Sequence, residues 1–213
     1  MAVLERWEDR LNHIVETVRQ MSRATDPERM VVQYGLRMRK LIRVDGFLSL
    51  SRRGLQRPQF IITRSDRFTH QPNPWTQRDR LPVLSGGILA DLIYADQPVI
   101  LNDFNASPDD PAYDHLKGHR SLMAIPHFSD GQGLNMVLHL RDDPNAFDPE
   151  AFPDLVLTSN LFGRATHNLV LSSQLRQAYD QIDTELRVVA DIQRSLLPRE
   201  LPRIPNLRLA AYY

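Results

Sequence analysis

The sequence predicts an α+β fold: a central antiparallel sheet flanked by helices, with a long C-terminal helix that forms a coiled coil. Three observations lead to this prediction. Apolar residues recur at helical spacing near both ends of the chain, and the period changes to that of strands between about residues 44 and 140. A last helical pattern runs from Asp148-Pro149 or Pro153 to about Leu197, which is longer than a small domain is wide.

Composition limits the possible functions of the chain. Its 213 residues allow one domain with helical extensions, and its formal net charge of zero gives no general attraction to nucleic acid or to anionic membranes. The absence of cysteine excludes disulfides, thiolate metal sites and cysteine nucleophiles. No apolar run approaches the ~20 residues of a membrane span, and the acidic N-terminus is unlike a signal peptide, so we expect a cytoplasmic protein.

Two helices are predicted at the N-terminus. Residues 2–22 are amphipathic, and Thr25-Asp26-Pro27-Glu28 is a capping box with proline in the first turn of the second helix. That helix is expected to end near Ile42. Its predicted inner face consists of Met30, Val31, Tyr34, Met38 and Leu41.

The middle of the chain has strand character with short helices. A predicted hairpin comes first, and irregular segments alternate with short elements after it. In chain order we predict strands at 44–51 and 58–63, an irregular stretch at 65–85, a helix at 88–94, a strand at 97–101, an irregular stretch at 102–110, and a short helix capped by Asp110-Pro111.

The clearest hairpin joins residues 121–128 to 134–140 through Asp130-Gly131. Both arms are apolar on both faces, which predicts a central sheet covered on both sides. Pro126 cannot donate a ladder hydrogen bond, so its position should be at a sheet edge or near a strand end.

The C-terminal helix carries a heptad pattern that predicts a dimer. Leu175, Ile182, Val189 and Leu196 recur every seven residues, and Glu185 occupies one position where a core residue is expected. The predicted homodimer seam consists of Leu175, Ala178, Ile182, Leu186, Val189, Ile192 and Leu196.

The central region resembles a GAF domain. Arg120-Ser-Leu-Met-Ala-Ile-Pro126, the turn at Asp130-Gly131, the strand Leu134–Leu140 and Phe147 at the start of a helix are similar to that family's signature. The resemblance covers residues 24–170 and implies a sensory domain that binds a small molecule. The family's pocket implies as candidates Trp75, Leu89, Ile93, Tyr94, Phe104 and His139. The alternative is that these side chains fill the space themselves.

Two familiar ligand classes of GAF domains are disfavoured. The segment from Asp142 to Glu150 lacks the lysine and the adjacent acidic pair that the family uses for cyclic nucleotides, and no cysteine can attach a bilin. The ligand, if there is one, is therefore an unidentified small molecule.

The end of the chain is similar to the linker and first strand of SpoIIE/RsbU-type serine phosphatases, of the metal-dependent PPM class. The matching residues are Glu185–Pro198, Leu201-Pro202 and Leu207–Tyr213. The expected division is an N-terminal helix at 1–23, a GAF domain at 24–170, a coiled-coil linker at 171–198 and the truncated start of a phosphatase at 199–213. The resemblance implies Mn or Mg and a phosphoserine partner-switching protein for the full enzyme, with no catalytic residue, cofactor or metal in this fragment.

Other chemistry-bearing pairs have simpler interpretations. His115 and His119 have the spacing of metal ligands but no third ligand, and His127 is expected to be a half-buried histidine satisfied by the backbone. The pairs Asp109-Asp110 and Asp142-Asp143 stand beside proline, where acids cap free N–H groups.

The sequence thus predicts the regulatory GAF region of a PPM-type phosphatase. Two alternatives remain. The domain could be a dimerisation or docking module without a ligand, or it could be the GAF ligand sensor of another signalling enzyme, such as a kinase or cyclase.

Overall fold

The computed structural model of the chain describes residues 2–70, 72–129, 131–196, 205, 206, 208 and 210. The chain divides into two compact units, Met1–Val170 and Leu171–Tyr213. Leu197 and most of the strand predicted for 207–213 lie outside the described residues. No helix of the described part is long and apolar enough to cross a membrane.

The two N-terminal helices form as predicted. Helix α1 spans Ala2–Arg23 and α2 spans Pro27–Leu41. The Asp26 carboxylate accepts a hydrogen bond from the Arg29 N–H at 2.9 Å and caps α2. The inner face of α2 buries Met30, Tyr34 and Met38. The prediction that Leu41 belongs to this face is wrong, because Ile42 packs on the core at that end and Leu41 is exposed.

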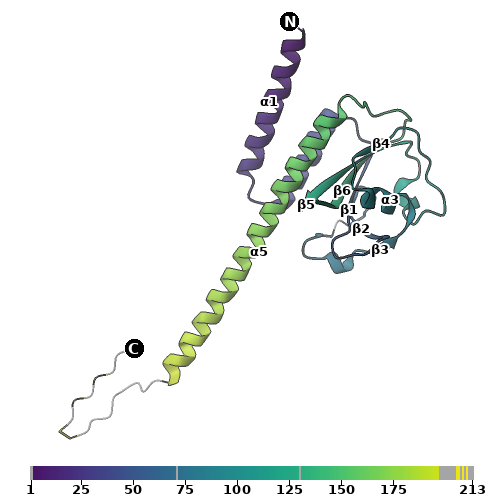
Figure 1. The fold of residues 1–213 in the computed structure, drawn as a ribbon. Coiled ribbons are helices and arrows are strands. Elements are labelled where there is room, and N and C mark those ends of the chain that lie inside the picture. The colour runs from purple at the N-terminus through teal and green to yellow at the C-terminus, as the bar shows by residue number, and fades with distance from the viewer. Residues whose placement is uncertain are drawn as a thin grey trace. The chain divides into compact units, whose positions relative to one another are not determined.

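The sheet has six antiparallel strands in the order β3-β2-β1-β6-β5-β4, which confirms the predicted α+β class (Figure 1). The strands are β1 (Gly46–Ser51), β2 (Gln59–Ser65), β3 (Val83–Ser85), β4 (Val99–Leu101), β5 (Ser121–Ser129) and β6 (Gln132–Arg141).

Part of the segment predicted as irregular, 65–85, is ordered into β3 and the 3-10 turn η1 (Arg78–Arg80). Three residues are too few to show the alternation that identifies a strand, and β3 exists because it pairs with β2. The other short helices, α3 (Gly87–Ala95) and α4 (Tyr113–Leu116), lie close to their predicted positions.

Both faces of the sheet are covered, as the two apolar arms of the hairpin predict. Leu122 and Leu138 belong to one core, together with α3. Met123, Ile125 and Val137 belong to the other core, together with α2 and the first part of α5 (Phe152–Leu196). Figure 1 shows α3 and α5 on opposite sides of the sheet.

Two local irregularities shape the sheet. A register shift makes Arg64 the partner of Ser49, while Ile62 is the partner of Leu50. Consequently Ile61 and Arg64 lie on the face that carries α2. Pro126 lies in an interior strand, but the ladder with β4 has already ended at Ala124, so its missing N–H leaves no β4 group without a partner.

Candidate functional site

Four of the six predicted pocket residues come together in the core beside α3. Leu89 and Ile93 are fully buried and Phe104 is 7% exposed. Tyr94 packs at the edge of the same core, and its hydroxyl donates a hydrogen bond to the Gln59 carbonyl at 2.9 Å. These side chains lie in contact with a continuous apolar cluster that includes strands β1, β5 and β6.

The other two predicted residues lie elsewhere. His139 is on β6 between Leu138 and Leu140, which face the α3 side, so strand alternation turns His139 toward α2. Trp75 lies in the segment before β3, with its ring 5.1 Å from the Arg64 guanidinium. The six candidates therefore belong to three separate places, and ligand binding among them stays a prediction.

His139 belongs to a hydrogen-bonded chain, here called the polar chain, made of the buried Tyr34, Ser159 and His139 and the partly buried His127. The Tyr34 hydroxyl lies 3.3 Å from His139 Nε2 and 2.8 Å from Ser159 Oγ. Ser159 Oγ lies 2.7 Å from His127 Nε2. The polar chain joins α2, β5, β6 and α5, so it connects the long helix to both hairpin strands.

The polar chain has two self-consistent hydrogen-bond directions. In one, His139 donates to Tyr34, Tyr34 to Ser159, and Ser159 to His127. In the reverse direction His139 would carry its proton on Nδ1, an atom that is buried and has no partner in the described structure. Because a buried N–H without an acceptor is rarer than a bare lone pair, the first direction is favoured.

Burial keeps the polar chain neutral. Burial lowers the pKa of His127 to about 4, and burial together with the neighbouring His127 lowers the pKa of His139 to about 4. Burial also raises the pKa of Tyr34. Gly163 on α5 permits this packing, because a Cβ there would lie 2.8 Å from the His127 ring.

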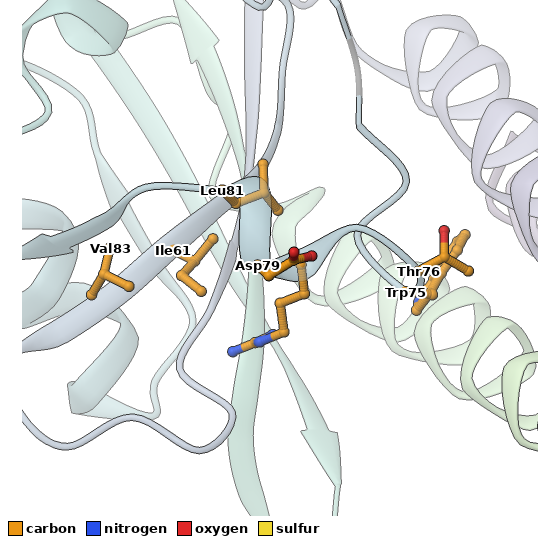
Figure 2. A pocket seen from close by; sticks show the side chains of 7 residues that line it. Ile61, Trp75, Thr76, Asp79, Leu81 and Val83 are labelled. Carbon is orange, nitrogen blue, oxygen red and sulfur yellow. The ribbon is translucent and has the colours of Figure 1, made fainter.

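Trp75 lines an open depression of about 490 Å³ on the α2 side of β2 and β3 (Figure 2). Its lining is largely apolar but includes one arginine and one aspartate. We call it the Trp75 depression, and its lining residues are Ile61, Trp75, Thr76, Arg78, Asp79, Leu81 and Val83.

The paired histidines and aspartates have structural roles. α4 ends at Leu116, so His115 and His119 do not share a helix; His115 Nδ1 lies 3.0 Å from Ser65 Oγ, and His119 Nδ1 lies 2.7 Å from an Asp142 oxygen. Asp110 accepts hydrogen bonds from the Ile88 and Ala112 N–H groups, as expected of a capping residue. No cluster of three or more metal-ligating side chains occurs within the described residues.

The predicted dimer seam is exposed in the single chain. Its large members are between 49% and 78% exposed, and Ala178 is exposed as well. Glu185 accepts a hydrogen bond from the Gln181 amide one turn earlier at 3.0 Å. An apolar stripe this long, without a cover of its own, is the surface from which coiled coils are built.

Solved structures with this arrangement of sheet and helices identify the fold. The GAF domain of a phosphoenolpyruvate-protein phosphotransferase from Coxiella burnetii matches with a TM-score of 0.56 and 11% identity, over 78% of this chain and 96% of that one. The fold is that of a GAF domain. The GAF domain of the Acinetobacter phosphoenolpyruvate-protein phosphotransferase matches with a TM-score of 0.54 and 12% identity, over 78% of this chain and 97% of that one.

A third GAF domain, from a two-component sensor histidine kinase of Bacillus halodurans, gives a TM-score of 0.52 and 11% identity over 70% of this chain and 99% of that one. At these identities the likeness concerns the fold alone. No family model matches the sequence, and no curated protein matches it.

Sequence reasoning missed the connections that lie across elements. Tyr34 was expected as an apolar inner-face residue and His127 as bonded to the backbone, yet both bond to Ser159. Ser159 follows Thr158 within a helical pattern and carries no signal of its own. Its role comes from its position in the fold, where it lies between Tyr34 on α2 and His127 on β5 and bonds to both.

Proposed function

We propose that the chain is the sensory and dimerising GAF region of a PPM-type serine phosphatase. The observation that carries the proposal is the exposed heptad stripe on residues 171–196 of α5. A cytoplasmic homodimer formed through this stripe would present two output domains side by side.

The hydrophobic effect favours the pairing. Leu175, Ile182 and Val189 are each about half exposed, as are the residues between them on the stripe. Burying side chains of this size contributes about 1.5–3 kcal/mol each relative to full exposure. Two parallel copies would bury the stripe of each chain against the other, which a single helix cannot do.

The first part of α5 supplies a physical route from the domain to the seam. Leu155 and Phe162 are buried in the core on the α2 face, and Ser159 joins the polar chain. A change in the sheet would therefore act on the helix through packed and hydrogen-bonded groups. Two arrangements of a helix pair that differ by a small rotation are an established form of switch.

The output assignment rests on the similarity of Glu185–Pro198 and the following residues to the phosphatase linker. Under this proposal the longer protein uses Mn or Mg to remove phosphate from the phosphoserine of a partner-switching protein. The residues encoded after Tyr213 test it directly: a Gly-Gly-Asp segment and metal-binding aspartates are expected, and their absence removes the phosphatase.

A second candidate is a dimerisation module without a ligand. The specific observation in its favour is that Leu89, Ile93 and Phe104 are buried in the core, where the family's pocket would be. A ligand there would have to displace them. A thermal shift from a metabolite that is lost in a Phe104→Trp variant, but kept in a variant of the exposed Phe128, would argue against this candidate.

The dimer is tested by the double substitution Ile182→Lys and Val189→Lys. Two charges in the stripe should convert a dimer to a monomer in sedimentation equilibrium, because each lysine would have to be buried against its own copy. The matched control carries the same charges on another face, as Gln177→Lys with Thr184→Lys, and should remain a dimer. If the Ile182/Val189 variant remains a dimer, the seam is elsewhere.

A further inference from the structure

Two pairs of arginines that are withdrawn from solvent differ in their partners. Arg52 lies 2.5 Å from an Asp96 oxygen, and Arg141 lies 2.6 Å from an Asp45 oxygen. Arg64 and Arg78 are also partly buried, but neither forms an ion pair with a carboxylate among the described residues. Since removing a charge from water is costly without a partner, these two arginines require an explanation.

Arg64 is the more isolated of the two. Its Nη2 is buried and makes no hydrogen bond in the described structure, and its guanidinium stacks on the Trp75 ring. Burial lowers the pKa of Arg64, and the charge of Glu28 offsets this only in part. The Glu28 carboxylate already accepts a hydrogen bond from the Asn73 amide.

Arg78 lines the Trp75 depression itself. It donates hydrogen bonds to Ser51 Oγ at 3.2 Å and to the Arg53 carbonyl at 2.5 Å. Burial and the nearby positive charge of Arg53 both lower the pKa of Arg78. A guanidinium has five N–H donors, so three remain for another acceptor. Asp79 also lines the depression but is exposed and forms no ion pair with Arg78.

The remaining lining of the depression is apolar. Ile61 and Val83 are register partners on adjacent strands and point to the same face, and Leu81 lies beside them (Figure 2). Trp75 lies at the other end of the depression, where the Arg64 guanidinium covers one face of its ring. The depression therefore combines a cation with unused donors and an apolar floor.

We propose that the Trp75 depression binds a small molecule with an anionic head, a carboxylate or a phosphate, and an apolar body. The head is held by Arg78, and the body lies on Trp75, Ile61, Leu81 and Val83. Arg64 orients Trp75 and adds positive charge. The site lies on the sheet face opposite Leu89 and Ile93, and it is independent of the dimer seam and of the phosphatase assignment.

The test uses benzoate as the carboxylate probe, phenyl phosphate as the phosphate probe and benzamide as the uncharged match, at constant ionic strength. Binding is followed by the indole N–H signal of Trp75, which a Trp7→Phe variant separates from the only other tryptophan. At least one anionic probe should give a saturable shift in the millimolar range, and benzamide should bind about tenfold more weakly or not at all.

Variants locate the site. Arg78→Gln should weaken binding of the anion about tenfold, whereas Arg80→Gln, at an exposed arginine two residues away, should leave it unchanged. If Arg78→Gln does not fold, Trp75→Ala is the second variant, because it removes part of the apolar lining while Arg78 stays in place. Binding is then followed by a backbone amide signal of the depression instead of the indole N–H, and it should be weaker than in the unsubstituted protein. The proposal is overturned if no probe gives a saturable shift, if benzamide binds as well as the anions, or if Arg80→Gln weakens binding as much as Arg78→Gln.

Discussion

The two parts of α5 have the same helical backbone but opposite environments. Between Phe152 and Val170 the helix buries Leu155, Thr158, Ser159, Phe162 and Val170. From Leu171 to Leu196 every residue is exposed except Ala190, which is partly exposed. Helical periodicity is present in both parts, so periodicity alone does not tell whether the partner of a stripe is the chain's own sheet or a second chain.

The composition of each part explains the difference. The first part mixes apolar residues with Ser159 and Gly163, which fit a surface that already contains His127 and the Tyr34 hydroxyl. The second part repeats large aliphatic residues every seven positions and separates them with charges, which suits an identical helix. We expect substitutions in the first part to change folding and those in the second part to change assembly.

The largest expected effect comes from Phe162→Ala. Phe162 is 2% exposed and lies 5.1 Å from the Tyr34 ring centroid to centroid, so the substitution should lower the free energy of unfolding by about 3–5 kcal/mol. Denaturant titration measures this loss. It is carried out in the Ile182→Lys/Val189→Lys background, because unfolding of a monomer does not depend on protein concentration. Leu186→Ala is the control in the second part of the helix, and a loss above about 1 kcal/mol there would contradict the comparison.

Ser159→Ala is expected to lower the free energy of unfolding by about 1–3 kcal/mol, because it leaves Tyr34 and His127 without their shared partner. The exposed Ser172→Ala in the other part of the helix should have no measurable effect. In the Ser159→Ala/Tyr34→Phe double variant, the loss in the free energy of unfolding should be smaller than the sum of the losses in the two single variants. Strict additivity would show that the polar chain does not act as a unit.

A pH-dependent effect on stability should come from the two histidines of the polar chain. In the unfolded chain each histidine binds a proton below its usual pKa of about 6.5. In the folded domain this pKa is lowered to about 4. Between about pH 6.5 and pH 4 the unfolded state binds more protons than the folded state. The free energy of unfolding therefore falls as the pH falls, by up to about 1.4 kcal/mol per pH unit for each histidine.

Urea titrations between pH 7 and pH 4 measure this slope. A His127→Gln/His139→Gln variant should show a smaller slope, although not a flat one, because burial also lowers the pKa of His115. An unchanged slope in that variant would mean that the two rings are solvated.

The smallest expected effect is a gain in the affinity of the proposed dimer. Glu185 occupies a core position of the heptad, so Glu185→Leu should tighten the proposed dimer by about 1 kcal/mol, or several-fold in the dissociation constant. Asp180→Leu, which adds the same apolar side chain on another face of the helix, should not tighten it. Sedimentation equilibrium at several concentrations distinguishes the two variants, and equal tightening would contradict the assigned seam.

The α+β class, the order of the main elements and the covered sheet could all be predicted from the amino-acid sequence. Local patterns specify these features: the two arms of the hairpin from 121 to 140 are apolar on both faces, a capping box precedes the second helix, and apolar residues recur at helical spacing near both ends of the chain. β3 was missed, because three residues contain no period and the strand depends on its neighbour β2.

Which side chains meet depends on the packing of the elements in three dimensions. The packing places His139 on the opposite face from Leu89, through strand alternation, and connects it to Tyr34 and, through the Tyr34 hydroxyl, to Ser159. It also turns Arg64 toward Trp75 through a register shift in β1 and β2. Such contacts depend on register and packing between segments far apart in the chain, and a one-residue shift reverses the facing of a side chain without leaving a trace in the local sequence.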